Sequence, residues 1–177
     1  MKKIIHDKTF VPFLTGKDIQ QAVTRIAEQI NMDYKGRSPL CIAILNGSFM
    51  FASDLFKQLS IDAEISFIKL ASYKGTSSTG NVVTAIGLEA VLHNRDVILI
   101  EDIVDTGKTL SAFLPQLQDH QPTSIKICSL LHKKEATVHP IKIDYLGFEI
   151  PNLFVVGYGL DYDGLGRNLD QIMQVEH

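Results

Sequence analysis

The chain has 177 residues, of which 45% are hydrophobic and 21% charged, and its formal net charge is −3. This length suits one domain with a sizeable core, which we place at residues 1–177, and is too short for two full-sized domains. The mild acidity argues against non-specific binding to nucleic acid or to an anionic membrane. We expect a cytoplasmic protein, because no apolar run is long enough to span a membrane and MKKIIHDKTF at the start lacks the apolar segment of a signal peptide.

The first predicted element is a helix. Apolar residues recur at helical spacing from Ile19 to Ile30, and Thr15 is a plausible N-cap. The wholly apolar run LCIAIL (40–45) then predicts a strand that is covered on both faces. After the turn NGS, the segment FMFASDLFKQL predicts a second helix.

Strand candidates and helices alternate along the rest of the chain. A further helix is marked by the apolar residues Leu110, Phe113, Leu114 and Leu117. The further strand candidates are residues 63–72, 97–100, 124–131, 141–148 and 153–160. This alternation predicts an α/β fold with a mainly parallel, twisted sheet flanked by helices. In such folds ligands bind beyond the carboxyl ends of the strands.

Two familiar nucleotide motifs fail on inspection. GKT (107–109) resembles the end of a nucleoside-triphosphatase phosphate loop, but Asp102 stands where the first glycine belongs and would face the phosphates. GYGLDY (157–162) resembles the dinucleotide-binding fingerprint, but Tyr162 stands where its third glycine belongs. These mismatches argue against both classes of site.

The string EDIVDTGKT (101–109) needs another interpretation. Taken singly, Glu101 and Asp102 are most simply solvated charges at a strand end, with Thr106 capping a helix. Taken together, three carboxylates beside a phosphate-type loop repel one another unless a ligand or cation offsets them. Ionised carboxylates accept hydrogen bonds from ribose hydroxyls, and a helix N-terminus suits a phosphate.

The string therefore predicts a cradle for a ribose 5-phosphate. Glu101 and Asp102 would bind the ribose. The residues predicted to bind the 5′-phosphate are Asp105, Thr106, Gly107, Lys108 and Thr109.

VILIEDIVDTGKTL (97–110) resembles the phosphoribosyl-diphosphate signature of the type I phosphoribosyltransferases. The resemblance extends over about residues 10 to 175, in the same order, to the hypoxanthine-guanine (6-oxopurine) branch of that family. Its further motifs are LNGSFMFASDL (45–55), SY (72–73), SLLHKK (129–134), GFEIPNLFVVGYGLDY (147–162) and Arg167. The resemblance implies a type I core with a small hood formed by terminal segments. It also implies a purine-salvage enzyme that transfers the 5-phosphoribosyl group from phosphoribosyl diphosphate to N9 of hypoxanthine, with guanine as a second substrate.

The same resemblance implies roles for single residues. Asp105 would be the general acid/base at N7 of the purine. The residues implied for pyrophosphate binding are Asn46 and Gly47, after a cis peptide bond at Leu45–Asn46, with Ser72, Tyr73 and Arg167. Asn46 stands where many relatives carry a basic residue, so the side chain adds no positive charge there.

The purine and the metal ion complete the implied site. Lys133 would donate to O6 of the purine, Phe154 would stack on its ring, Val155 would offer backbone groups to its edge, and Asp161 would lie beside it. Mg²⁺ would be held by Asp161, with Glu101 and Asp102 near by. Small-molecule substrates are the implied partners, and the assembly would be a homodimer or homotetramer.

Two alternatives stay open, one for the function of the protein and one for the state of its two cysteines. A non-catalytic regulator of the same fold that binds nucleotides or RNA is disfavoured by the low positive charge and by the intact Asp105, Lys133 and Asp161. Cys41 and Cys128 lie within apolar runs, which favours two buried, reduced thiols over a disulfide.

Overall fold

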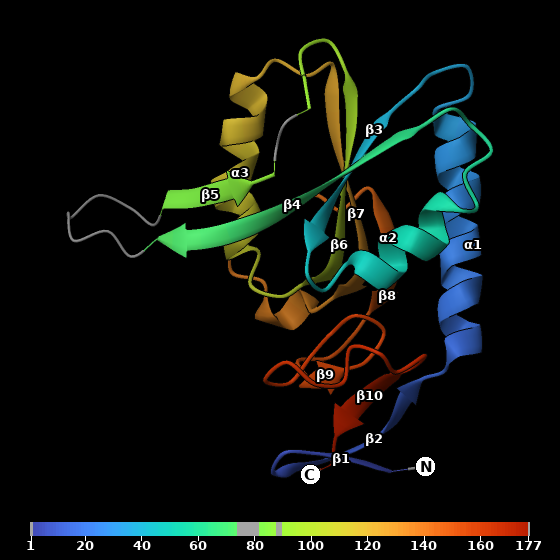
Figure 1. The fold of residues 1–177 in the computed structure, drawn as a ribbon, viewed down its shortest axis with the longest axis vertical. Coiled ribbons are helices and arrows are strands. Elements are labelled where there is room, and N and C mark those ends of the chain that lie inside the picture. The colour runs from blue at the N-terminus through green and yellow to red at the C-terminus, as the bar shows by residue number, and fades with distance from the viewer. Residues whose placement is uncertain (1, 74–81, 88–89, 177) are drawn as a thin grey trace.

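The computed structural model describes residues 2–73, 82–87 and 90–176, and the side chains of residues 71–73 and 82–86 are outside this description. Its centre is a six-stranded sheet in the order β5-β4-β3-β6-β7-β8 (Figure 1). The strands are β3 (Leu40–Leu45), β4 (Glu64–Tyr73), β5 (Val82–Ile86), β6 (Asp96–Val104), β7 (Ser124–His132) and β8 (Tyr145–Glu149). All neighbours pair in parallel except β4 and β5, which are antiparallel. The predicted mainly parallel sheet is confirmed.

Helices cover both faces of this sheet. Figure 1 shows α1 (Gly16–Asp33) and α2 (Phe49–Phe56) on one side and α3 (Lys108–Asp119) on the other. Thr15 caps α1 as predicted, because its hydroxyl accepts from the N–H of Asp18 while its own N–H donates to the Asp18 carboxylate at 3.0 Å. None of the helices in the described part of the chain is both long enough and apolar enough to cross a membrane.

Strand β3 is buried on both faces, as its unbroken apolar run predicts. Cys41 and Ala43 belong to the core beneath α1 and α2, whereas Leu40 and Ile42 belong to the core beneath α3. Cys41 and Cys128 are both free and buried, which confirms two unpaired thiols. Burial raises the pKa of Cys41 to about 12, so this thiol stays protonated.

A second, antiparallel sheet forms a hood from segments near the two ends of the chain. Its order is β1-β2-β10-β9 (Figure 1). Its strands are β1 (Lys3–Ile5), β2 (Lys8–Leu14), β9 (Val155–Val156) and β10 (Ile172–Val175). A core of its own, built around Ile5, Phe10, Val156 and Met173, holds these strands together. The hood expected from the resemblance is confirmed.

Two strand predictions near the carboxyl end were wrong in extent. The apolar run 153–160 is not a strand of the main sheet, because only Val155 and Val156 are extended and they pair with β10. Gly157 and Gly159 both adopt φ of 102°, which turns the chain away from a strand path. The strand expected over 141–148 starts only at Tyr145.

Candidate functional site

The predicted site residues gather at the carboxyl edge of the main sheet. Strands β3, β6 and β7 end at Leu45, Val104 and His132, and the segment after each end carries predicted residues. The hood closes against this edge, because a Cβ built on Gly159 would lie 2.0 Å from the carbonyl oxygen of Gly47. The site is therefore an interface between the main sheet and the hood.

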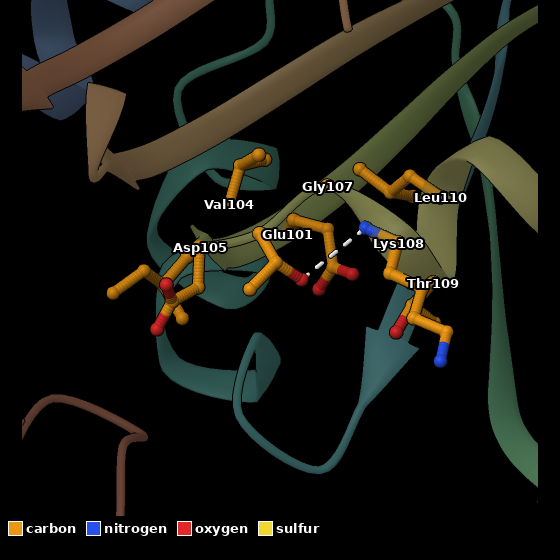
Figure 2. A pocket seen from close by; sticks show the side chains of 9 residues that line it. Glu101, Val104, Asp105, Gly107, Lys108, Thr109 and Leu110 are labelled. Atoms are coloured by element: carbon orange, nitrogen blue, oxygen red, sulfur yellow. Dashed lines mark hydrogen bonds between the residues drawn. The ribbon is translucent and has the colours of Figure 1, made fainter. Parts of the chain in front are cut away.

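A cavity of about 130 Å³ opens over the loop between β6 and α3. Figure 2 shows Asp105 on one side of it and Lys108 and Thr109 on the other. All five residues predicted to bind the 5′-phosphate line this cavity, together with Glu101, Ile103, Val104 and Leu110. Gly107 is the N-cap of α3, which contradicts the simpler alternative in which Thr106 caps the helix, although the Thr106 hydroxyl accepts from the N–H of Lys108 at 3.4 Å.

The backbone of this loop offers unsatisfied donors. Among the described residues, no acceptor lies within hydrogen-bonding distance and angle of the N–H groups of Thr106 and Gly107. Helix α3 begins at the next residue, and its dipole places partial positive charge at the same point. Unpaired amides at a helix N-terminus form a binding site for an anion such as phosphate.

Glu101 and Asp102 lie within β6 and not beyond its end, because the strand continues to Val104. Burial and the adjacent Asp102 raise the pKa of Glu101 well above its ordinary value, and only 9% of this residue is exposed. Burial also raises the pKa of Asp102, against the opposing effects of backbone N–H groups and the Arg167 charge. Among the described residues, no basic side chain forms an ion pair with either carboxylate, since Arg167 pairs with Asp161 instead.

The pyrophosphate loop packs tightly against Asp102. The peptide bond at Leu45–Asn46 is cis, as the resemblance implies. A Cβ built on Gly47 would lie 1.7 Å from Oδ2 of Asp102, so any larger residue would displace the carboxylate or the loop. The backbone of Ser72 and Tyr73 belongs to β4, but their side chains, like residues 74–81, lie outside the description.

Asp105 and Lys133 form an ion pair across the ends of β6 and β7. Nζ of Lys133 lies 2.9 Å from Oδ2 of Asp105, and the lysine side chain is 9% exposed whereas that of Asp105 is 46% exposed. Strand β7 ends at His132, and Lys134 begins a short 3-10 helix, Lys134–Ala136, so the alternation of a strand does not extend to Lys134. The candidate acid/base and the candidate O6 donor are therefore direct neighbours.

The hood contributes an aromatic surface and a second ion pair. The ring of Phe154 is 42% exposed and packs edge-on against Tyr162, with ring centroids 5.4 Å apart. Val155 next to it is buried in β9. Asp161 and Arg167 pair at 2.7 Å, and the other carboxylate oxygen of Asp161 accepts from the N–H of Gly164.

The described residues contain no ready-made metal cage. No group of three or more acidic, histidine or cysteine side chains in the described ranges is placed to hold an ion. Mg²⁺ is usually bound by one or two protein carboxylates together with substrate phosphates and water, not by an all-protein cage. The all-oxygen donors Glu101, Asp102 and Asp161 at this edge fit that mode of binding.

Some contacts of the site have little or no signature in the sequence. Gly159 approaches Gly47, and the glycines of GYG (157–159) are the one signal in the sequence for this close backbone approach. The hydroxyl of Tyr162 donates to Asp7 from the β1–β2 turn at 2.5 Å, which ties the aromatic surface to the N-terminal hairpin. Nothing in the sequence near Asp7 indicates this bond.

Comparison with known proteins places this arrangement in a family. The model described as the phosphoribosyl transferase domain matches residues 13–163. A hypoxanthine-guanine phosphoribosyltransferase of Staphylococcus aureus (strain Mu50) is 41% identical over 169 residues, which cover 95% of this chain and 94% of the relative. Its counterpart from Mycobacterium bovis is 39% identical over 166 residues, covering 90% and 82% of the two chains.

Solved structures agree with the sequences. The crystal structure of a Staphylococcus aureus hypoxanthine phosphoribosyltransferase superposes with a TM-score of 0.88 at 39% identity, covering 94% of this chain and 91% of that one. A hypoxanthine-guanine phosphoribosyltransferase of Bacillus anthracis gives a TM-score of 0.87 at 35% identity, covering 94% and 98%. From its domain match, its relatives and its fold, this chain belongs to the phosphoribosyl transferase family.

Proposed function

We propose that this chain transfers the 5-phosphoribosyl group from phosphoribosyl diphosphate to N9 of hypoxanthine and guanine, as a cytoplasmic enzyme of purine salvage. Relatives that carry the name hypoxanthine-guanine phosphoribosyltransferase match it over nearly their whole length. The single observation from its own site that carries the proposal is the pair of Asp105 and Lys133, whose charged atoms lie 2.9 Å apart beside the phosphate-type loop.

This pair matches one edge of a 6-oxopurine. In the tautomer that leaves N9 free to bond to C1′, hypoxanthine and guanine carry a donor N7–H next to an acceptor O6. Asp105 is an acceptor when ionised, and Lys133 is purely a donor. A purine that inserts its edge between them exchanges one ion pair for two hydrogen bonds to charged groups. Adenine would present an amino group to Lys133, so two donors would meet and the buried lysine would lose its partner.

The sugar and phosphate fit the adjoining surface. Glu101 and Asp102 accept hydrogen bonds from the ribose hydroxyls, which favours their ionised forms despite burial. The amides of Thr106 and Gly107, the Thr109 hydroxyl and the N-terminus of α3 bind the 5′-phosphate. The exposed face of Phe154 stacks on the purine, and the backbone of Val155 meets its edge.

The reaction then needs one proton transfer. As N9 forms its bond to C1′ of the ribose, the bond between C1′ and the pyrophosphate oxygen breaks, and the N7 proton passes to Asp105. Lys133 holds O6 and so fixes the purine in the orientation that presents N9 to C1′. The backbone of Asn46 and Gly47, together with Ser72, Tyr73 and Arg167, binds the leaving pyrophosphate.

Mg²⁺ fits this site as an ion that arrives with the substrate diphosphate. Asp161, with Glu101 and Asp102, would complete its oxygen ligands, and the ion would neutralise charge on the leaving group. We also expect the chain to work as a homodimer or homotetramer.

A substrate panel tests the proposal. Steady-state rates with phosphoribosyl diphosphate should be measured for hypoxanthine, guanine and adenine, in the wild type and in Lys133→Gln. We expect turnover of both 6-oxopurines and discrimination against adenine by about 10⁴-fold. Glutamine can turn either its oxygen or its amide nitrogen toward position 6, so Lys133→Gln should narrow that gap. Nucleotide binding without any turnover would instead support a non-catalytic regulator.

A further inference from the structure

The segment that follows β7 packs against the phosphate-type loop. The Thr137 hydroxyl lies 2.8 Å from the carbonyl oxygen of Asp105 and 3.0 Å from that of Lys133. The N–H groups of Val138 and His139 both donate to the carbonyl oxygen of Thr106, at 3.1 and 3.0 Å. Two successive carbonyls of the loop are therefore held by three successive residues, 137–139.

These contacts fix the direction of the amides that face the cavity. A trans peptide unit is planar, so its C=O and the N–H of the next residue point in opposite directions. When Thr137 holds the Asp105 carbonyl, the N–H of Thr106 points the other way, and the Thr106 carbonyl orients the N–H of Gly107 in the same manner. These two N–H groups have no acceptor among the described residues.

The Thr137 hydroxyl matters more to Asp105 than to Lys133. The carbonyl of Lys133 has a second donor, the N–H of Ala136 at 3.0 Å. For the carbonyl of Asp105, Thr137 is the only donor within the described ranges. A hydroxyl has one proton to donate, and Nε2 of His132 also lies within hydrogen-bonding distance of the Thr137 oxygen, at 3.1 Å.

His139 adds a steric restraint at the third loop residue. A Cβ built on Gly107 would lie 2.3 Å from the carbonyl oxygen of His139, so only glycine fits at this point of the loop. The loop is thus held by hydrogen bonds at two carbonyls and by close packing at the glycine that follows.

We propose that Thr137 is a positioning residue whose hydroxyl, by holding the Asp105 carbonyl, aims the loop amides at the 5′-phosphate of the substrate. The proposal rests on the phosphoribosyl transfer proposed above. It predicts that the hydroxyl acts on phosphate affinity and little on purine affinity, because the Lys133 backbone keeps its other partner.

Three variants at one position separate this role from general stability. Thr137→Val removes the hydroxyl at nearly constant shape, Thr137→Ala removes it without placing a methyl group in its stead, and Thr137→Ser keeps it. The matched control is Thr24→Val, which removes a hydroxyl-to-carbonyl bond of 2.9 Å within α1, away from the site. Thermal midpoints of all four variants report the purely structural effect.

The functional readouts are the dissociation constant of ribose 5-phosphate by calorimetry and the separate KM values for phosphoribosyl diphosphate and hypoxanthine. We expect Thr137→Val and Thr137→Ala to weaken ribose 5-phosphate binding roughly tenfold and to raise the KM for phosphoribosyl diphosphate by a similar factor, since one restraint on a charge-binding loop is lost. The KM for hypoxanthine should change by less than about twofold, and Thr137→Ser and Thr24→Val should bind like the wild type.

Equal ribose 5-phosphate affinity in the wild type, Thr137→Val and Thr137→Ala would overturn the positioning role, whatever the turnover. So would a Thr137→Ser variant as weak as Thr137→Val, or a loss of the same size in Thr24→Val. If the wild type binds ribose 5-phosphate in a Thr137-dependent way but does not turn over any purine, the positioning role stands and the proposed function fails.

Discussion

The two ends of the main sheet differ in whether their charged side chains are paired within the protein. At the amino end, the carboxylate of Asp33 accepts from Nζ of Lys126 at 2.8 Å and from the hydroxyl of Tyr145 at 2.6 Å. Arg37 pairs there with Asp96 at 3.1 Å. These hydrogen bonds lower the pKa of Asp33, so the ionised carboxylate is the favoured form.

At the carboxyl end the pKa values of the carboxyl groups are shifted in the opposite direction. Glu101 is buried and the adjacent Asp102 is half-buried, neither has an ion-pair partner in the described ranges, and the pKa values of both are raised. The amides of Thr106 and Gly107 are unpaired beside them. Charged groups at the amino end are paired within the protein, whereas Glu101, Asp102 and the two amides at the carboxyl end have no such partners among the described residues. Substitutions at the two ends should therefore have different kinds of effect.

Asp105→Asn should give the largest change. The amide has nearly the shape of the carboxylate but cannot take the N7 proton, so turnover should fall by about 10²–10⁴-fold. Binding of phosphoribosyl diphosphate should stay close to normal. Single-turnover rates and calorimetric titration measure the two effects separately, and near-normal turnover would remove Asp105 from this role.

Gly107→Ala, at the carboxyl end of the main sheet, has a matched control in Gly36→Ala at the amino end. Both glycines have nearly the same left-handed conformation, with φ of 76° and 74°, and alanine in that conformation costs about 1–2 kcal/mol. A Cβ at Gly36 meets nothing within 4 Å, whereas at Gly107 it lies 2.3 Å from a backbone oxygen. Overpacking should therefore add about 1–3 kcal/mol for Gly107→Ala alone.

Chemical denaturation measures the stability of this pair, and the KM for phosphoribosyl diphosphate measures function. We expect Gly36→Ala to leave that KM unchanged and Gly107→Ala to raise it. The same KM in both variants would contradict a phosphate site at the start of α3.

Thr109→Val should have a smaller effect that is confined to binding. It removes one hydroxyl that lines the cavity, and a lost hydrogen bond to a charged group costs roughly 1.5–3 kcal/mol. Calorimetry with the nucleotide product should show weaker binding, while the affinity for free hypoxanthine should be preserved. An unchanged nucleotide affinity would place the phosphate elsewhere.

Glu101→Gln should stabilise the ligand-free protein, by about 1 kcal/mol or about 2–4 °C in Tm. Because its pKa is raised in the folded state, Glu101 holds its proton to a higher pH there than in the unfolded chain. The full contribution of Glu101 to stability is present below its pKa in the unfolded state. This contribution is lost as the pH rises through its pKa in the folded state. Thermal unfolding across this pH range should show that the Tm of Glu101→Gln falls less with rising pH than the Tm of the wild type.

Asp33→Asn is the control at the amino end. The pH dependence of the stability that Asp33 contributes should have the opposite sign to that of Glu101. The pKa of Asp33 is lowered in the folded state, so its contribution is present above the unfolded pKa and is lost as the pH falls through the folded one. The variant should lose stability at neutral pH and flatten the acid side of the profile. Parallel pH profiles in both variants would contradict the contrast between the two ends.

The sequence predicted those parts of the site that are contiguous in the chain. Residues 101–109, which we predict to bind the ribose and the 5′-phosphate, lie on one strand, one turn and one helix start, so their order alone brings them together. The capping box at Thr15 and the doubly covered strand β3 are local patterns of the same kind. The family resemblance predicted the hood, which the structure confirms, and it is the source of the roles that we propose for Lys133 and Phe154.

Contacts between distant segments could not be predicted in the same way. The pairing of Lys133 with Asp105 depends on β7 lying next to β6 in a particular register and on the strand stopping at His132. The close approach of Gly47 to Asp102 depends on β3 lying on the other side of β6. The run 153–160 is as apolar as a core strand, and only its place in the hood shows that most of it is not extended.

The hood also implies an order in which the parts of the chain fold. Strands β2 and β10 pair with each other although they come from opposite ends of the sequence, whereas each parallel pair in the main sheet joins segments much closer in the chain. Contacts between distant segments form late, because the intervening chain must first be ordered. The residues of the site that lie on the main sheet should therefore be in place before those that lie on the hood. Pulse-labelled hydrogen exchange during refolding should protect β6 before β2, and simultaneous protection of both strands would show that the hood and the sheet fold as one unit.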